Sequence, residues 1–207
     1  MERSEYITIA AAAEAEHLEK RSRFLSLAAP VSDESAALRL LDDLRARHRD
    51  ANHNTYAYIL RSGTTRFSDD GEPGGTAGMP VLEVLRRRGL CDVIVVVTRY
   101  FGGILLGAGG LVRAYTLAAT LALDAATLLH MRRCTVFSLE IPYSFYGKLQ
   151  NLLPAFDATV LEDNFAERIS LTLRIQTDKL PALQKQLAEL TAGSVRAVVL
   201  REEFSNT

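Results

Sequence analysis

Three carboxylates lie within four consecutive positions of a glycine-rich segment near the middle of the chain. Asp69, Asp70 and Glu72 precede the pair Gly74-Gly75. Carboxylate oxygens are ligands that Mg²⁺ accepts together with several water molecules. The same side chains can instead organise an Asx-type turn and pair with nearby arginines, which is the preferred interpretation. We therefore predict no cofactor and no resident metal, with Mg²⁺ at this loop as the alternative.

A second glycine cluster, Gly107, Gly109 and Gly110, precedes a long apolar segment that is predicted to be helical. The first turn of a helix has backbone N–H groups without partners, and the helix dipole attracts anions there. The cluster therefore predicts a phosphate contact, from RNA or from a nucleotide. The alternative is a tight turn that lets a deeply buried helix approach a strand. The Gly-Lys-Ser/Thr ending of a P-loop is absent from the sequence.

Arg99 and Tyr100 follow an uninterrupted β-branched run, which is typical of a central strand buried on both faces. Open α/β sheets place ligand-binding groups at the ends of such strands. An arginine beside an aromatic ring suits a phosphate with a stacked base. In the alternative, Tyr100 and Phe101 close the core and Arg99 pairs with Asp70 or Glu72.

Four further side chains are candidates for ligand contact. Arg113 lies one turn into the predicted helix and could hold a phosphate. Arg86 and Arg87 crowd the last turn of the preceding helix, where they form either a backbone-phosphate patch or a solvated helix end. His53, just before a predicted strand, could contact a ligand or satisfy a turn.

These candidates need a scaffold of strands and helices, and the hydrophobic periodicity supplies one. After residue 132 the composition restarts with a strand, a helix, two strands, a helix and a strand, the βαββαβ order of the ferredoxin-like plan. We predict an α+β protein with a βαβ-type two-layer N-terminal domain (1–132) and a ferredoxin-like C-terminal domain (133–207). The N-terminal strands are expected at 6–9, 13–19, 23–29, 55–60 and 93–97, and the helices at 32–49, 80–89 and 110–129.

The overall charge excludes a polycation. The 207 residues carry a formal net charge of −1, and both predicted domains are close to neutral. Any nucleic-acid binding must therefore use a local patch. No apolar run approaches the length that spans a bilayer, so no membrane association is expected. Cys91 and Cys134 fit neither a metal spacing nor a disulfide framework, which predicts reduced thiols in a cytoplasmic protein.

Around these motifs the chain resembles the IMPACT family. The resemblance implies an N-terminal domain like one found in elongation factor G and the GHMP small-molecule kinases, and a C-terminal domain like the last domain of elongation factor G. Eukaryotic relatives regulate translation through a ribosome-associated partner and an additional domain without a counterpart here, so that partner is not expected. The matching motifs are Ser68-Asp69-Asp70-Gly71-Glu72-Pro73, Gly75-Thr76-Ala77-Gly78, Val96-Val97-Thr98-Arg99-Tyr100-Phe101-Gly102-Gly103 and Leu106-Gly107-Ala108-Gly109-Gly110-Leu111-Val112-Arg113-Ala114-Tyr115.

Two functions from different classes remain open. The first is a non-enzymatic, translation-associated regulator that binds RNA or the ribosome, and with it a protein partner of the translation machinery, through a glycine-rich, arginine-bearing face. The second is an enzyme that acts on a phosphorylated or nucleotide substrate, with Mg²⁺ or an acid/base group at the acidic loop. The missing nucleophile and the incomplete phosphate loop count against the enzyme, and the neutral charge counts against the binder. The binder is the preferred prediction.

Overall fold

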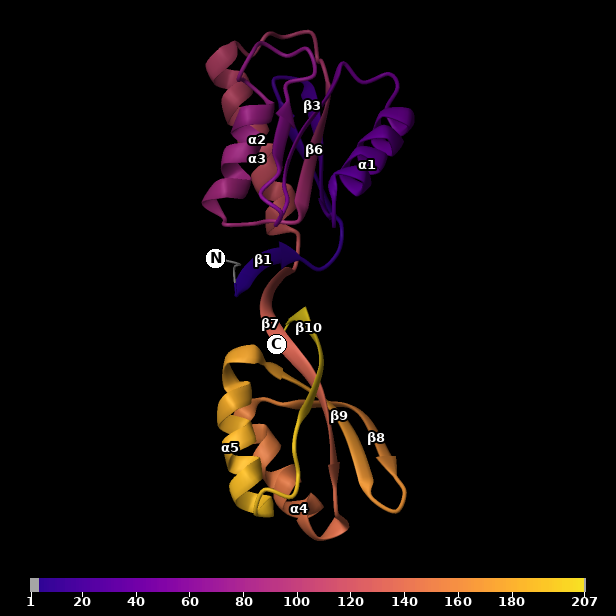
Figure 1. Ribbon diagram of the computed structural model, residues 1–207. Helices are drawn as coiled ribbons and strands as arrows, with labels where there is room; N and C mark the ends of the chain where they lie inside the picture. Colours follow the sequence, from indigo (N-terminus) through magenta and orange to yellow (C-terminus); the bar gives the residue numbers. More distant parts are fainter. Residues whose placement is uncertain (1–3, 207) are drawn as a thin grey trace. The chain divides into compact units, whose positions relative to one another are not determined.

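The computed structural model describes residues 4–206, which divide into two compact units (Figure 1). One unit is Tyr6–His130, and the other contains residues 131–206 together with residues 4 and 5. Ser4 and Glu5 join the second unit because the Ser4 carbonyl accepts a hydrogen bond from the Arg133 N–H (2.9 Å) and Glu5 lies 3.9 Å from the Arg132 guanidinium. The domain predicted at residues 1–132 includes residues 4, 5, 131 and 132, which the observed division places in the second unit.

The first unit contains a five-stranded antiparallel sheet in the order β2-β3-β6-β4-β5. Its central strand is buried from Val93 through Arg99, as the β-branched run predicts for a strand covered on both sides. The sheet is antiparallel throughout, so the parallel-sheet rule that suggested a ligand site at the end of this strand does not apply. The strands are β2 (Ala13–Glu19), β3 (Ser22–Pro30), β4 (His53–Ile59), β5 (Thr65–Ser68) and β6 (Val93–Tyr100).

Helices cover both faces of this sheet. Helices α2 (Gly78–Arg87) and α3 (Ala108–Asp124) lie on one side, and α1 (Glu34–Arg47) lies on the other (Figure 1). Two separate apolar cores result, because alternate residues of β6 point to opposite faces. Val95 and Val97 pack in the core beneath α2 and α3, and Ile94 and Val96 pack beneath α1. The α+β class is confirmed, but the unit has three layers instead of the two that were predicted.

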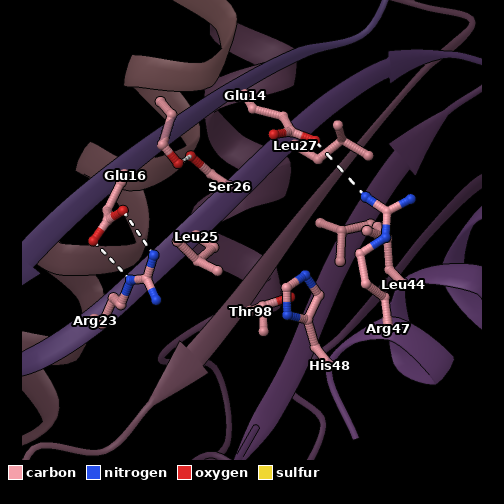
Figure 2. A pocket seen from close by; sticks show the side chains of 12 residues that line it. Glu14, Glu16, Arg23, Leu25, Ser26, Leu27, Leu44, Arg47, His48 and Thr98 are labelled. Carbon is pink, nitrogen blue, oxygen red and sulfur yellow. Dashed lines mark hydrogen bonds and ion pairs between the residues drawn. The ribbon is translucent and has the colours of Figure 1, made fainter.

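A cavity of about 440 Å³ opens on the α1 face of the sheet (Figure 2). Strands β2 and β3 form one wall, and the C-terminal end of α1 forms the other, so that Leu25 and Leu27 face Leu44 and His48 across it. Thr98 of β6 contributes to the floor. No site on this face was predicted from the sequence.

The second unit has the predicted βαββαβ order. Its sheet runs β10-β7-β9-β8, and β1 (Glu5–Ile9) also pairs with β7. Apolar residues of β7 and β9 form a core with both helices of this unit. No helix in the described residues 4–206 is long and apolar enough to cross a membrane. The elements are β7 (Leu128–Ile141), α4 (Tyr143–Leu152), β8 (Thr159–Phe165), β9 (Ile169–Gln176), α5 (Leu180–Thr191) and β10 (Val198–Asn206).

Two motif glycines allow close backbone approach. A side chain at Gly102 would overlap the backbone of Arg21, and a side chain at Gly78 would lie 2.6 Å from the Ser68 carbonyl oxygen. Backbone atoms on the far side of such a contact cannot rotate away as a long side chain can. The absence of a side chain at Gly102 therefore lets the segment that follows β6 lie directly against the turn between β2 and β3.

We expect Gly102→Ala to lower the free energy of unfolding by about 1–3 kcal/mol, the usual cost of overpacking. The matched control is Gly74→Ala, because a methyl group there meets no atom within 4 Å and the backbone φ is ordinary. Urea denaturation of both variants provides the measurement. Equal stability of the two variants would contradict the close approach at Gly102.

Candidate functional site

The acidic loop is built by its own side chains. Asp69 accepts hydrogen bonds from the backbone N–H groups of Gly75 (2.8 Å), Ala77 (3.0 Å) and Gly78 (2.8 Å). The last two donors lie at the start of α2, so Asp69 caps this helix from outside it, and its negative charge suits the positive end of the helix dipole. Asp69 is therefore occupied in holding the loop.

Asp70 joins the loop to β4 and α1. Its carboxylate accepts a hydrogen bond from the Asn54 N–H (2.6 Å) and lies 3.4 Å from the Arg45 guanidinium. Its carbonyl oxygen accepts a hydrogen bond from His53 Nδ1 (2.8 Å). The residue has a φ of +45°, a left-handed conformation that Asp tolerates better than most residues. Asp70 thus organises the turn and pairs with an arginine, as in the preferred interpretation, and His53 has a structural partner.

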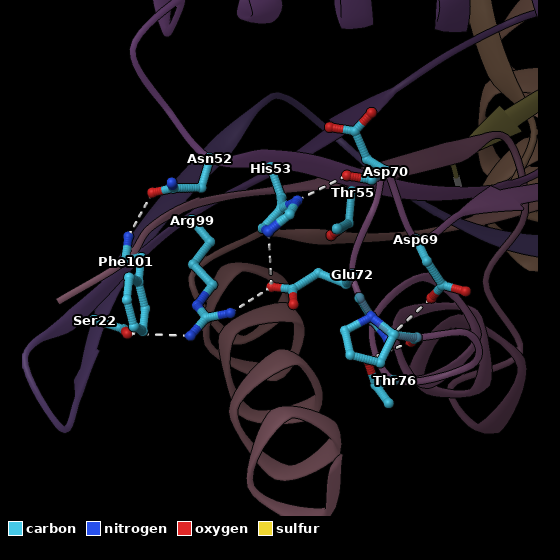
Figure 3. A network of polar contacts seen from close by, with 12 residues as sticks. Ser22, Asn52, His53, Thr55, Asp69, Asp70, Glu72, Thr76, Arg99 and Phe101 are labelled. Atoms are coloured by element: carbon cyan, nitrogen blue, oxygen red, sulfur yellow. Dashed lines mark hydrogen bonds and ion pairs between the residues drawn. The ribbon is translucent and has the colours of Figure 1, made fainter. Parts of the chain in front are cut away.

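Glu72 is the centre of a buried polar network (Figure 3). Its Oε1 accepts hydrogen bonds from Arg99 Nη1 (2.7 Å) and from the Tyr115 hydroxyl (2.6 Å). His53 Nε2 lies 3.9 Å from the same oxygen. Burial, together with the adjacent carboxylate of Glu72, raises the pKa of Tyr115 far above its usual value, so the hydroxyl remains a donor. The network joins the acidic loop to β6 and α3.

Arg99 lies within β6 and is only 5 % exposed. Phe24 of β3 and His53 of β4 flank it across the sheet in one row. Its guanidinium carbon is 5.4 Å from the ring centre of Phe24 and 5.5 Å from that of Phe101, and Nη2 donates to the Ser22 hydroxyl (3.3 Å). Its Nε has no hydrogen-bond partner in the described part of the chain. Arg99 thus makes the predicted alternative contact with Glu72 and is not available to an RNA phosphate at the surface.

Tyr100 points to the opposite face of the sheet from Arg99, because successive residues of a strand alternate. Its hydroxyl lies 2.9 Å from His48 Nδ1 and donates to Asp50 (3.3 Å). The prediction that Arg99 and Tyr100 hold a phosphate and its base together is therefore wrong. The aromatic rings beside the Arg99 guanidinium are those of Phe24 and Phe101, and Phe101 is 44 % exposed.

The start of α3 remains open to a ligand. Gly107 precedes the helix with a φ of +70°, and no side chain caps the helix. A methyl group at Gly109 would meet only the Arg113 guanidinium, at 3.7 Å, whereas one at Gly110 would be 3.1 Å from Leu106. Arg113 is exposed and forms no ion pair within residues 4–206. The structure brings Gly107, Gly109, Gly110 and Arg113 together at one helix end.

Arg86 and Arg87 lie away from this helix end. They belong to the last turn of α2, and the next residue, Arg88, contacts Asp124 (2.5 Å) and the Thr120 carbonyl near the C-terminal end of α3. The 17 residues of α3 span about 25 Å, so the two arginines cannot share one phosphate patch with the glycines at its start. Arg86 also forms an ion pair with Glu83 (2.7 Å). The prediction that Arg86 and Arg87 belong to the same phosphate-binding surface as the glycines at the start of α3 is therefore wrong.

Sequence reasoning missed the roles of Tyr115 and Ser22. Tyr115 ends the last of the matching motifs, but nothing in the local pattern reveals that this helix residue and the first residue of β3 meet at one buried ion pair. Within residues 4–206, no group of three or more His, Cys, Asp or Glu side chains is arranged to hold a metal ion. The charged groups of the acidic loop and β6 thus have partners within the same unit, and the start of α3 is exposed.

We expect Glu72→Ala to lower the free energy of unfolding by about 3–5 kcal/mol, because it leaves the Arg99 guanidinium buried without a counter-charge. The control is Glu83→Ala, which removes an exposed ion pair of the same length and should cost less than about 1 kcal/mol. Chemical denaturation followed by circular dichroism measures both. A loss below about 1 kcal/mol for Glu72→Ala would show that the network does not anchor the loop.

Comparisons with known proteins agree on one family. Residues 20–123 match the model of the Impact N-terminal domain, and residues 139–194 match a domain of unknown function (DUF1949). The IMPACT family member YvyE of Bacillus subtilis is 35 % identical over 190 residues, which cover 91 % of this chain and 88 % of the relative. The IMPACT family member YigZ of Escherichia coli is 33 % identical over 187 residues (88 % and 92 %). A solved structure described as a hypothetical protein is 30 % identical, with a TM-score of 0.63 over 96 % of this chain and 98 % of that one. The chain therefore belongs to the IMPACT family.

Proposed function

We propose that this protein is a non-enzymatic RNA binder that regulates translation, and that it holds RNA phosphates at the N-terminal end of α3. The observation that carries the proposal is the uncapped start of this helix, with Arg113 unpaired one turn further on. Free backbone N–H groups, the helix dipole and a guanidinium all favour a phosphate at this position.

The other charged groups of the motif support this assignment by elimination. Asp69, Asp70, Glu72 and Arg99 are engaged in contacts that hold the loop and the strand. These carboxylates already serve as acceptors that hold the scaffold together. The helix start has no side-chain cap, so its N–H groups can meet a phosphate without any rearrangement, and the geometry favours binding over catalysis.

The residues before α3 supply apolar contacts of the kind that stack with bases. Phe101 exposes part of its ring, and Leu105 is 82 % exposed. Aromatic rings bind bases of any identity, since each base has a π face. The site therefore fits single-stranded RNA or an exposed loop of ribosomal RNA, with little dependence on sequence. A near-neutral protein that binds through a few such contacts should bind weakly and with a modest dependence on salt.

We expect Gly109→Asp to weaken binding of single-stranded RNA by at least about tenfold, because it places a negative charge between the helix start and Arg113. The position is exposed and its φ is ordinary, and an acidic residue at a helix start stabilises the fold, so a loss of binding cannot be attributed to unfolding. Arg113→Ala should weaken binding several-fold and reduce the slope of log K against log salt by about 0.7.

The matched control is Arg87→Ala, which removes an exposed arginine at the far end of the helical layer. Fluorescence anisotropy with a labelled RNA oligonucleotide, and co-sedimentation with ribosomal subunits, provide the measurements. If the unchanged protein binds neither RNA nor ribosomal subunits at low salt, the proposal fails. It also fails if Arg87→Ala weakens binding as much as Arg113→Ala.

A further inference from the structure

The cavity on the α1 face is separate from the proposed RNA site. The cavity lies on the α1 face of the sheet, whereas α3, whose start is the proposed RNA site, packs against the opposite face (Figure 1). A volume of about 440 Å³ is in the range of sites that hold small molecules, roughly 300–1,000 Å³. Its apolar lining consists of Leu25, Leu27, Leu44 and Val96.

Two ion pairs line the cavity (Figure 2). Arg23 holds Glu16 with two hydrogen bonds, of 2.7 and 3.0 Å, which makes a closed bidentate pair. Arg47 reaches from the end of α1 toward Glu14 of β2, but the closest atoms are 4.0 Å apart and both side chains are well exposed. Such an exposed pair contributes about 0–1 kcal/mol, so a ligand can separate it at little cost. The charges of the two pairs sum to zero.

His48 adds a free imidazole nitrogen to the cavity wall. While the Tyr100 hydroxyl donates to Asp50 (3.3 Å), its oxygen accepts from His48 Nδ1 (2.9 Å) in the tautomer that carries the proton on Nδ1. Burial and the nearby charge of Asp50 raise the pKa of Tyr100, which keeps the hydroxyl protonated. In the neutral imidazole Nε2 is then an acceptor, and it forms no hydrogen bond within the described residues 4–206.

We propose that this cavity binds a small zwitterion with an apolar side chain, the chemistry of an apolar amino acid or of a short apolar peptide. The ligand enters between Arg47 and Glu14: its carboxylate pairs with the guanidinium, and its ammonium pairs with Glu14 and donates to His48 Nε2. Its side chain lies on Leu25 and its apolar neighbours.

The balance of charges selects a zwitterion over an ion of one sign. A phosphate would face the carboxylates of Glu14 and Glu16, and a simple amine would face the guanidiniums of Arg23 and Arg47. A zwitterion replaces the long Arg47–Glu14 contact with two shorter ones and leaves no charge without a partner. The apolar lining then adds about 25 cal/mol for each Å² of ligand surface that it buries.

Isothermal titration calorimetry with L-leucine, L-phenylalanine and the dipeptide leucyl-leucine tests the proposal. We expect binding of the zwitterions and at least a tenfold loss for N-acetyl-leucine and leucinamide, each of which lacks one charge. Tighter binding of leucyl-leucine than of either amino acid would identify peptides as the source of the ligand, and the reverse would identify free amino acids. No binding of any zwitterion at millimolar concentration, or equal binding of the derivatives, would overturn the proposal.

Two variants locate the site. Arg47→Ala should weaken binding at least tenfold, whereas Arg39→Ala, an exposed arginine of the same helix outside the cavity, should leave it unchanged. Leu25→Glu should abolish binding by placing a carboxylate in the apolar lining, and Leu38→Glu is its control. All four variants should retain RNA binding, because they lie on the α1 side of the sheet. Zwitterion binding that persists in both cavity variants would show that it occurs elsewhere.

Discussion

The first unit depends on one buried carboxylate with two donors. Glu72 brings together a loop, a central strand and a helix, since Arg99 and Tyr115 both donate to the same oxygen. Two charges this deep in a protein are tolerated only as a pair. If the loop moved away, it would leave the Arg99 guanidinium buried without a counter-charge. The position of α3, and with it the open helix start, follows from this contact. Side chains that suggest catalysis in the sequence therefore mainly hold the acidic loop, β6 and α3 in place.

The side chains that hold the first unit together are therefore different from those that remain exposed to a partner. Most acidic and aromatic side chains of the motifs make contacts with other residues of the same unit. What remains for a partner is a helix start formed by glycine, the Arg113 guanidinium and the exposed apolar side chains before α3. A surface made largely of backbone suits a ligand that is itself repetitive, such as a phosphate chain, because backbone N–H groups do not discriminate between side groups.

Much of the fold could be predicted from the sequence, and the reason lies in local pattern. The β-branched run of β6, the helix that begins near Pro80 and the βαββαβ order all follow from periodicity and from turn residues. The layering and the register could not be predicted, because they depend on which strands become neighbours. Thus the pairing of Arg99 with an acidic residue was foreseen as an alternative, but the choice of Glu72 required the row His53–Arg99–Phe24 across the sheet. The opposite orientation of Tyr100 follows from simple alternation once β6 is known to extend through it.

The capping of α2 by Asp69 also sets the number of residues between Asp69 and the start of this helix. One carboxylate bonds to N–H groups six, eight and nine positions further on, and the Asp69 carbonyl accepts from the Glu72 N–H (2.9 Å). Each bond closes a ring of fixed size, so an inserted or deleted residue would break several rings at once. The turn between β4 and β5 caps no helix, and its main contact outside itself is the hydrogen bond that the Arg61 N–H donates to Asp92 (2.7 Å), so a change in its length disturbs fewer bonds and adds only a small loop entropy. Within this unit, natural variation in chain length should therefore be concentrated at such turns and absent from the acidic loop.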